Sequence, residues 1–347
     1  MGKRERLASV FDRIGFTSAV LATRRIRGAS WLTILSYHRI GMPAATYPFD
    51  SEVVDATPAE FDLQMRTLSE HATSIRMGQL VSHVTHGTPL PPNPVLVTFD
   101  DGYLECRDVA LPILQRYGLS ATFFIATRFI TDRSLFWWDR IAWVVKHTTK
   151  TSVTLDYPAA ATFDLTKRDA AIAKLARVVK STKDIDPDRF VAALEDAAGV
   201  RLSREDETRF TNELLLTWDD VRALRDAGMD VESHTRNHRV IATLGPSAIE
   251  DELAWSRDDL RREMGGAPTA VAYPCGRVGE TLPDVREAAL RTGYSVGFSN
   301  ASGVNPAGKL DPFALKRIGL DRGYPASMFR GSLAMPWLAD RAGALPW

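Results

Sequence analysis

The sequence has little of several features that would place it in common protein classes. Only two cysteines, Cys106 and Cys275, occur in 347 residues, which is too few for a disulfide framework and fits a reducing compartment. No apolar run reaches 18 residues, so a membrane-spanning helix is excluded. The chain has 43 Lys and Arg residues and 43 Asp and Glu residues. Its net charge is therefore zero and does not favour binding to nucleic acid. We expect a cytoplasmic globular protein that binds no nucleic acid.

Two adjacent carboxylates follow an apolar run at residues 95–99. The run is rich in β-branched residues and is typical of a buried strand in a parallel sheet. Asp100 and Asp101 at its end repel each other unless a cation or hydrogen-bond donors compensate. Because side chains alternate along a strand, one carboxylate could bind a metal while the other accepts a proton. A simple turn with a helix cap is the alternative interpretation.

A pair of histidines follows a second short strand, expected at residues 229–233. If the chain turns helically there, His234 and His238 lie on one face and can reach the same ion. With Asp101 they would form a site of two imidazoles and one carboxylate, with open positions for water and substrate. Two solvated histidines at a helix start are the alternative.

These two segments resemble the first two motifs of the polysaccharide deacetylase superfamily (NodB homology, carbohydrate esterase family 4). The matching residues are Thr98-Phe99-Asp100-Asp101-Gly102 and Ser233-His234-Thr235-Arg236-Asn237-His238. The resemblance implies an α/β fold, a distorted (β/α) barrel, and hydrolysis of N-acetyl or O-acetyl groups on sugars. It also implies that Asp100 is the base and that a divalent ion, usually Zn²⁺, is held by Asp101, His234 and His238.

The third motif of that family is altered here. A strand expected at 269–273 leads into a segment where Ala272 replaces the usual Arg and Cys275 replaces the usual aromatic residue. Arg277, or Arg317 at the end of a strand expected at 313–317, could supply the missing guanidinium. The backbone N–H near Cys275 could still stabilise an oxyanion, and its thiol is interpreted as a buried group rather than a nucleophile. The predicted substrate and oxyanion residues are Tyr273, Pro274, Cys275, Arg277 and Arg317.

His38 is the candidate for the general acid. No histidine follows His238, so the Leu-x-His usual near the end of the family is missing. His38 ends a strand expected at residues 31–37, and the carboxyl ends of barrel strands form the active face. This position resembles relatives that supply the imidazole from an early strand. A histidine bonded to a loop backbone is the alternative.

The barrel is expected to span residues 30–325, with a largely helical insertion at about 132–216. Strands expected at 121–125 and near 229 are about a hundred residues apart, whereas a crossover needs about a dozen. Within the insertion, Trp137 and Trp138 are interpreted as an anchoring core in preference to a sugar-stacking platform. Residues 326–347 are expected to form a C-terminal tail.

Residues 1–29 are expected to form a basic amphipathic helical segment. Seven Lys and Arg residues between 3 and 27 face only two acidic residues. They surround an apolar stripe with helical spacing, formed by Leu7, Val10, Phe11 and Ile14. The favoured interpretation is a helix docked on the barrel by this stripe and retained in the mature protein. A helix lying on an anionic membrane is the alternative, and a signal peptide is a weaker one because the apolar stretch is short.

We therefore predict a metal-dependent deacetylase whose partner is an acetylated polysaccharide, oligosaccharide or glycan precursor. One alternative is a metal amidohydrolase of the same fold acting on a small non-sugar amide, which the altered third motif leaves open. The other is a carbohydrate-binding barrel without catalysis, which would not need the four acidic and imidazole residues together.

Overall fold

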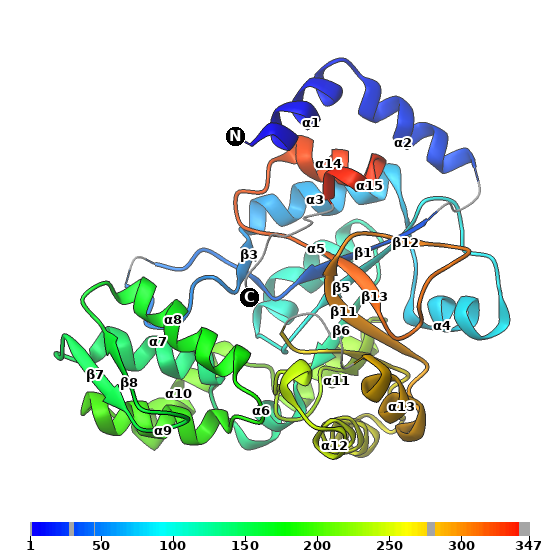
Figure 1. Ribbon diagram of the computed structural model, residues 1–347. Helices are drawn as coiled ribbons and strands as arrows, with labels where there is room; N and C mark the ends of the chain where they lie inside the picture. The colour runs from blue at the N-terminus through cyan, green and yellow to red at the C-terminus, as the bar shows by residue number, and fades with distance from the viewer. Residues whose placement is uncertain (1, 28–30, 45, 276–281, 340–347) are drawn as a thin grey trace.

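The computed structural model describes residues 2–27, 31–44, 46–275 and 282–339, and its centre is a ring of parallel strands (Figure 1). The ring order is β1-β5-β6-β9-β10-β11-β13, and β13 pairs with β1 to close it. Pairing is irregular between β11 and β13, which distorts the ring. The expected distorted (β/α) barrel is thus confirmed. Its strands are β1 (Trp31–Tyr37), β5 (Pro94–Phe99), β6 (Ala121–Ile125), β9 (Asp230–Ser233), β10 (Ala270–Ala272), β11 (Val296–Ser302) and β13 (Leu315–Gly319).

Alternate side chains of the ring strands fill the barrel interior. One buried cluster takes residues from around the ring, namely Leu32, Ile34, Leu96, Phe124, Ala272, Phe298 and Leu315. Residues of the other parity, such as Phe99, pack with the helices in a second cluster. Asp100 is an even number of residues after Leu96, and Arg317 is two residues after Leu315. Strand alternation therefore directs both side chains toward the barrel interior, at the carboxyl ends of the strands.

Helices cover the outside of the ring. The Thr57 hydroxyl caps α3 by accepting a hydrogen bond from the Glu60 backbone N–H, and the Glu60 carboxylate accepts one from the Thr57 backbone N–H. This reciprocal arrangement starts many helices. After β5, the π-helical turn Cys106–Ala110 precedes α5, because Pro112 has no N–H for the regular helical pattern. The outer helices are α3 (Pro58–His71), α4 (Met77–His86), α5 (Leu111–Arg116), α11 (Trp218–Asp226), α12 (Pro246–Met264) and α13 (Leu282–Thr292).

Several short elements complete the barrel. Strand β4 (Thr73–Ser74) is followed at once by α4. Gly293, which has φ 84°, ends α13, and β11 begins at Val296. The remaining short elements are β2 (Arg39–Ile40), β3 (Val54–Ala56), α6 (Thr127–Asp132), the 3₁₀ turn Ile241–Thr243 and β12 (Asn305–Pro306).

A mainly helical subdomain between β6 and α11 lies beside the barrel, at the lower left of Figure 1. It also contains a β-hairpin that the sequence prediction missed, in which Val153, Leu155 and Phe163 are buried. Trp137 and Trp138 are buried, as expected of an anchoring core. The elements are α7 (Trp137–His147), β7 (Ser152–Leu155), β8 (Ala161–Asp164), α8 (Arg168–Ser181), α9 (Pro187–Ala198) and α10 (Arg204–Leu214).

The two ends of the described chain pack together at the top of Figure 1. The N-terminal segment forms two helices, α1 (Lys3–Arg13) and α2 (Phe16–Ile26), separated at Gly15, which has φ 79°. The expected C-terminal tail contains α14 (Ala326–Ala334) and α15 (Pro336–Ala339), whose Phe329 and Leu333 are buried. Among the helices described, none is long and apolar enough to cross a membrane.

Candidate active site

A cavity of about 140 Å³ opens at the carboxyl ends of the ring strands. Side chains from β1, β5, β9 and β11 reach it from the barrel, and Trp138 and Lys180 reach it from the insertion. This end of a parallel barrel is where active sites are built. The cavity brings together six of the residues predicted from the sequence, namely His38, Asp100, Asp101, His234, His238 and Cys275.

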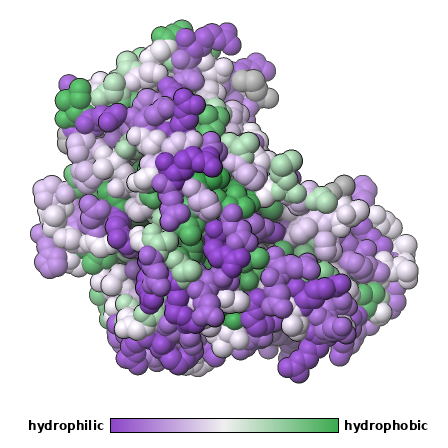
Figure 2. All heavy atoms as spheres, turned by 180° about the vertical axis from the view of Figure 1, so that it is seen from behind, coloured by the Kyte–Doolittle hydropathy of each residue, from purple (hydrophilic) through white to green (hydrophobic). Residues whose placement is uncertain are grey.

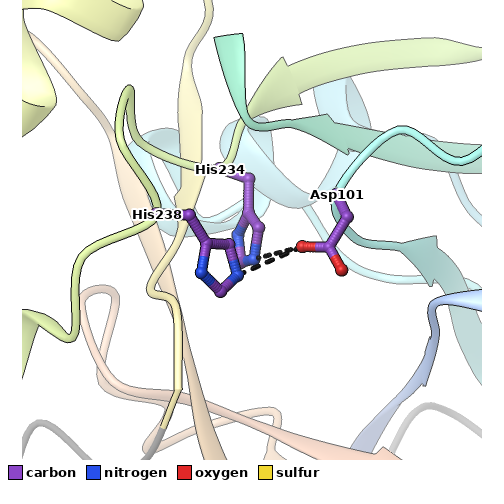
Figure 3. A group of neighbouring side chains, drawn as sticks. All are labelled: Asp101, His234 and His238. Carbon is purple, nitrogen blue, oxygen red and sulfur yellow. Dashed lines mark ion pairs between the residues drawn. The ribbon is translucent and has the colours of Figure 1, made fainter. Parts of the chain in front are cut away.

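Asp101, His234 and His238 converge on one point (Figure 3). The Oδ1 atom of Asp101 lies 3.3 Å from Nε2 of His234 and 3.1 Å from Nε2 of His238. All three side chains are buried. Ligand atoms around a tetrahedral ion at about 2.0–2.1 Å are about 3.3 Å apart. The three side chains are therefore spaced to hold one metal ion.

The protonation of these groups also fits a cation. His234 Nδ1 lies 2.8 Å from the carbonyl oxygen of Ala272, which can only accept, so Nδ1 carries the proton and Nε2 presents a lone pair. Burial lowers the pKa of His238, although Asp101 opposes the effect, so this imidazole is neutral at pH 7. Asp101 Oδ1 is buried without a hydrogen-bond partner among the described residues. Lone pairs facing each other at this distance suit a divalent ion that binds nitrogen and oxygen ligands.

The loop that carries the histidines is not the helical turn considered from the sequence. Residues 234–238 form an irregular loop in which Thr235 has φ 60° and His238 has φ 50°. Glu252 of α12 holds this loop, because its carboxylate accepts from the backbone and side-chain amides of Asn237, both at 2.8 Å. Glu252 is thus a positioning residue that sequence reasoning missed, and no local motif marks it.

A sharp turn after β5 separates the roles of the two carboxylates. Asp101 has φ 77° and Gly102 has φ 99°, conformations that are left-handed and favour glycine. A Cβ atom on Gly102 would lie 3.3 Å from Cδ1 of Ile130, so a side chain there would be both strained and crowded. The turn directs Asp101 to the histidines while Asp100 remains over the barrel interior.

Asp100 is paired with a buried arginine. Arg317 Nη1 donates to Asp100 Oδ1 at 2.8 Å, and Arg317 Nη2 donates to Asn300 Oδ1 at 2.6 Å. Burial would raise the pKa of Asp100, but the Arg317 guanidinium, together with the imidazoles of His234 and His38, lowers the pKa below its ordinary value. Asp100 is therefore ionised at neutral pH. Of the two arginines considered, Arg317 makes this contact, and Arg277 lies outside the described residues.

We expect Arg317→Met to move the acid limb of the activity profile to higher pH. Removing one partner of a buried ion pair costs about 3–5 kcal/mol of stability, because a buried charge is left unpaired. Asp100 can avoid this cost by taking up a proton, so its pKa rises. A group that must be ionised is inactive below its pKa, and activity is lost at a higher pH than in the wild type. A pH profile of kcat/KM checks this, and an unchanged acid limb would contradict the pairing.

His38 is held by Asp55, a second residue that sequence reasoning missed. Asp55 Oδ2 lies 3.1 Å from His38 Nδ1 and also accepts the His38 backbone N–H. Burial opposes the charged imidazole, but the Asp55 carboxylate, with smaller contributions from Asp101 and Asp100, raises the pKa of His38 to about 9. The ring is therefore protonated at neutral pH, and Nε2 is the nitrogen left to meet a substrate. Asp55 lies on β3 with no motif around it.

We expect Asp55→Asn to shift the alkaline limb of kcat/KM to lower pH. The amide keeps an oxygen for the His38 backbone N–H but loses the charge, so the pKa of His38 falls from about 9 toward its ordinary value of about 6.5. An acid catalyst is active below its pKa, so activity disappears earlier as the pH rises. An alkaline limb that stays in place would show that His38 is not the group titrating there.

The insertion supplies one wall of the cavity. The ring of Trp138 lies 4.6 Å from the ring of His238 and stacks on Phe136 at 4.3 Å. Its Nε1 donates to the Tyr103 hydroxyl at 3.0 Å. Trp138 thus joins the anchoring core to the metal site and limits the access of water to His238.

The altered third motif contributes less to the cavity than predicted. Cys275 lines it, and burial raises the pKa of its thiol although Lys180 opposes the effect, so the thiol is protonated and a poor nucleophile. Tyr273 and Pro274 are not among the described lining residues. The Tyr273 side chain is buried in a core cluster against Gly297, where any Cβ atom would lie 1.8 Å from its hydroxyl oxygen. The Tyr273 side chain therefore does not line the cavity, and its predicted contact with substrate stays a prediction for the backbone alone.

Comparisons with known proteins identify relatives of this chain. The polysaccharide deacetylase family model matches residues 87–297. The YxkH protein of Bacillus subtilis (strain 168) is 21% identical over 314 residues, which cover 90% of this chain and 78% of that protein.

Solved structures share the fold. The Streptococcus pyogenes deacetylase PplD in complex with acetate has a TM-score of 0.56 and 18% identity, and covers 86% of this chain and 96% of its own. IcaB from Ammonifex degensii has a TM-score of 0.52 and 16% identity, and covers 90% and 98% of the two chains. Because the family match spans 211 of 347 residues, the chain belongs to the polysaccharide deacetylase family, whose members are hydrolases acting on carbon–nitrogen bonds.

Proposed function

We propose that this protein is a metal-dependent deacetylase that removes N-acetyl groups from a polysaccharide, oligosaccharide or glycan precursor. The observation that carries the proposal is the buried group of Asp101, His234 and His238 next to a second carboxylate, Asp100, that does not join it. Such an arrangement holds a metal and a separate base within one cavity. The two cysteines, which are free, support a cytoplasmic location.

The predicted ligands would hold a divalent ion, and a mixed imidazole and carboxylate set suits Zn²⁺. When bound, that ion lowers the pKa of water and polarises the acetyl carbonyl. Asp100, kept ionised by Arg317, takes the proton of the attacking water. The predicted oxyanion donor is the backbone N–H near Cys275.

His38 completes the reaction as the general acid. Its protonated ring, maintained by Asp55, donates a proton to the leaving nitrogen so that the product departs as an amine. Proton removal and proton donation thus fall to two groups whose pKa values are shifted in opposite directions, Asp100 downward and His38 upward. That division suits hydrolysis of an amide at neutral pH.

Acetate release tests the proposal. N-acetylglucosamine oligomers and small linear and cyclic amides would be compared as substrates after removal of metal by a chelator and again after addition of Zn²⁺. We expect acetate from the oligomers only with the metal restored. Turnover of the small amides in place of the oligomers, or binding of oligomers without turnover in the presence of Zn²⁺, would overturn it.

A further inference from the structure

The helices α1 and α2 are fixed to the rest of the protein by small, buried side chains. Ala8 and Leu21 are completely buried, and Ala8 faces Gly331 of α14, where a Cβ atom would lie 3.3 Å from the Ala8 Cβ. Arg330 ties both helices down, because it donates to Asp12 at 2.8 Å and to Ser18 at 2.7 Å. The two helices are therefore packed in a fixed orientation on the rest of the fold, and one face of the pair points outward.

Most of the predicted apolar stripe lies on that outer face, which corrects the sequence interpretation that the stripe docks on the barrel. Of the four stripe residues, Phe11 alone packs, partly buried, against the core. The side chains of Leu7, Val10, Ile14 and Phe16, here called the apolar ridge, are 37%, 51%, 67% and 46% exposed. With Ile26 they make up five of the ten large exposed hydrophobic side chains among the described residues. In Figure 2, small green groups lie among purple and pale ones at the top of the molecule, where these helices lie. Apolar side chains gathered in this way mark an interaction surface.

Basic residues surround the apolar ridge. Lys3, Arg6, Arg13 and Arg27 are exposed, whereas the two acidic residues are engaged, Glu5 with the Gly2 backbone N–H and Asp12 with Arg330. Residues 1–27 carry seven basic and two acidic side chains, so in a chain of net charge zero the other 320 residues carry five more acidic than basic ones. The positive charge is thus concentrated beside the apolar ridge.

The combination of exposed apolar side chains and basic residues favours one kind of binding partner over another. Two copies of the chain meeting through the apolar ridge would bring two strongly positive surfaces together, which repel each other. A bilayer with anionic headgroups instead accepts apolar side chains at the level of the headgroups and attracts the basic rim. We propose that α1 and α2 bind the surface of an anionic membrane and hold the barrel beside it.

Vesicle sedimentation with the full chain tests this inference without any assay of activity. We expect binding to vesicles of phosphatidylcholine with phosphatidylglycerol, and binding at least about tenfold weaker to phosphatidylcholine alone. Val10→Ser with Ile14→Ser should lower binding to the anionic vesicles about tenfold or more, because it removes apolar contacts and keeps every charge. Leu290→Ser with Met42→Ser is the matched control, since both residues are exposed elsewhere, and it should bind as the wild type does.

Equal binding by the ridge variant and the wild type, or absence of binding to the anionic vesicles, would overturn the inference. A wild-type dimer in gel filtration that the ridge variant lacks would also overturn it, because a second copy would then cover the apolar ridge. Thermal unfolding of each variant, followed by circular dichroism, verifies that the helix pair is intact. Since both variants leave the cavity untouched, their acetate release should match that of the wild type.

Discussion

Asp100→Asn is expected to lower kcat about 10²- to 10⁴-fold, the usual contribution of a general base, while the protein keeps its metal. The amide is nearly the same size and its oxygen still accepts from Arg317, which contacts Asp100 Oδ1 at 2.8 Å. It cannot take a proton from water at neutral pH. Acetate release and metal content, measured on the same preparation, separate the loss of the base from the loss of the metal.

A suitable control is Asp258→Asn, the same change at an exposed carboxylate outside the cavity. It should leave both acetate release and metal content at wild-type values. Full activity of Asp100→Asn would refute the role of Asp100 as base. Loss of metal from this variant would mean that Asp100 belongs to the ligands.

His234→Ala is expected to remove both metal binding and activity. Loss of a residue that only orients a ligand costs about 10–100-fold in metal affinity, and loss of a ligand should cost more. The remaining Asp101 Oδ1 and His238 Nε2, 3.1 Å apart, would offer two ligands where a zinc site normally takes at least three from the protein. Metal analysis after dialysis, together with kcat/KM, measures both effects.

His147→Ala provides the matched control, because this histidine is exposed and bonded to the Trp143 backbone. It should retain a wild-type metal content. Undiminished metal in His234→Ala would contradict the ligand set, and retained activity without metal would contradict the proposed chemistry.

Features encoded in short segments were predictable from the sequence. The apolar run before Asp100 forms a buried strand as expected, and the closed barrel that the motifs implied is confirmed. The start of the helix Pro58–His71 is also encoded locally, because Thr57 and Glu60, which cap it, are three residues apart. Asp101, His234 and His238 meet because each follows a ring strand, and the carboxyl ends of parallel strands lie at one edge.

Features that depend on distant pairing were not predictable. Arg317 lies 217 residues from Asp100, and their contact depends on the register of β13 beside β1. The partner of His38, Asp55, comes from a three-residue strand without a sequence signal. Helical periodicity located the apolar stripe of α1 but could not say which face docks, because contact with Gly331 favours the small Ala8 over larger side chains.

The most direct test is a crystal structure of the protein grown with Zn²⁺. We predict one ion bound by a carboxylate oxygen of Asp101 and by Nε2 of both His234 and His238 at about 2.0–2.2 Å, with Asp100 outside this set and still paired with Arg317. An ion bound elsewhere, or one that recruits Asp100 in place of a histidine, would contradict the account.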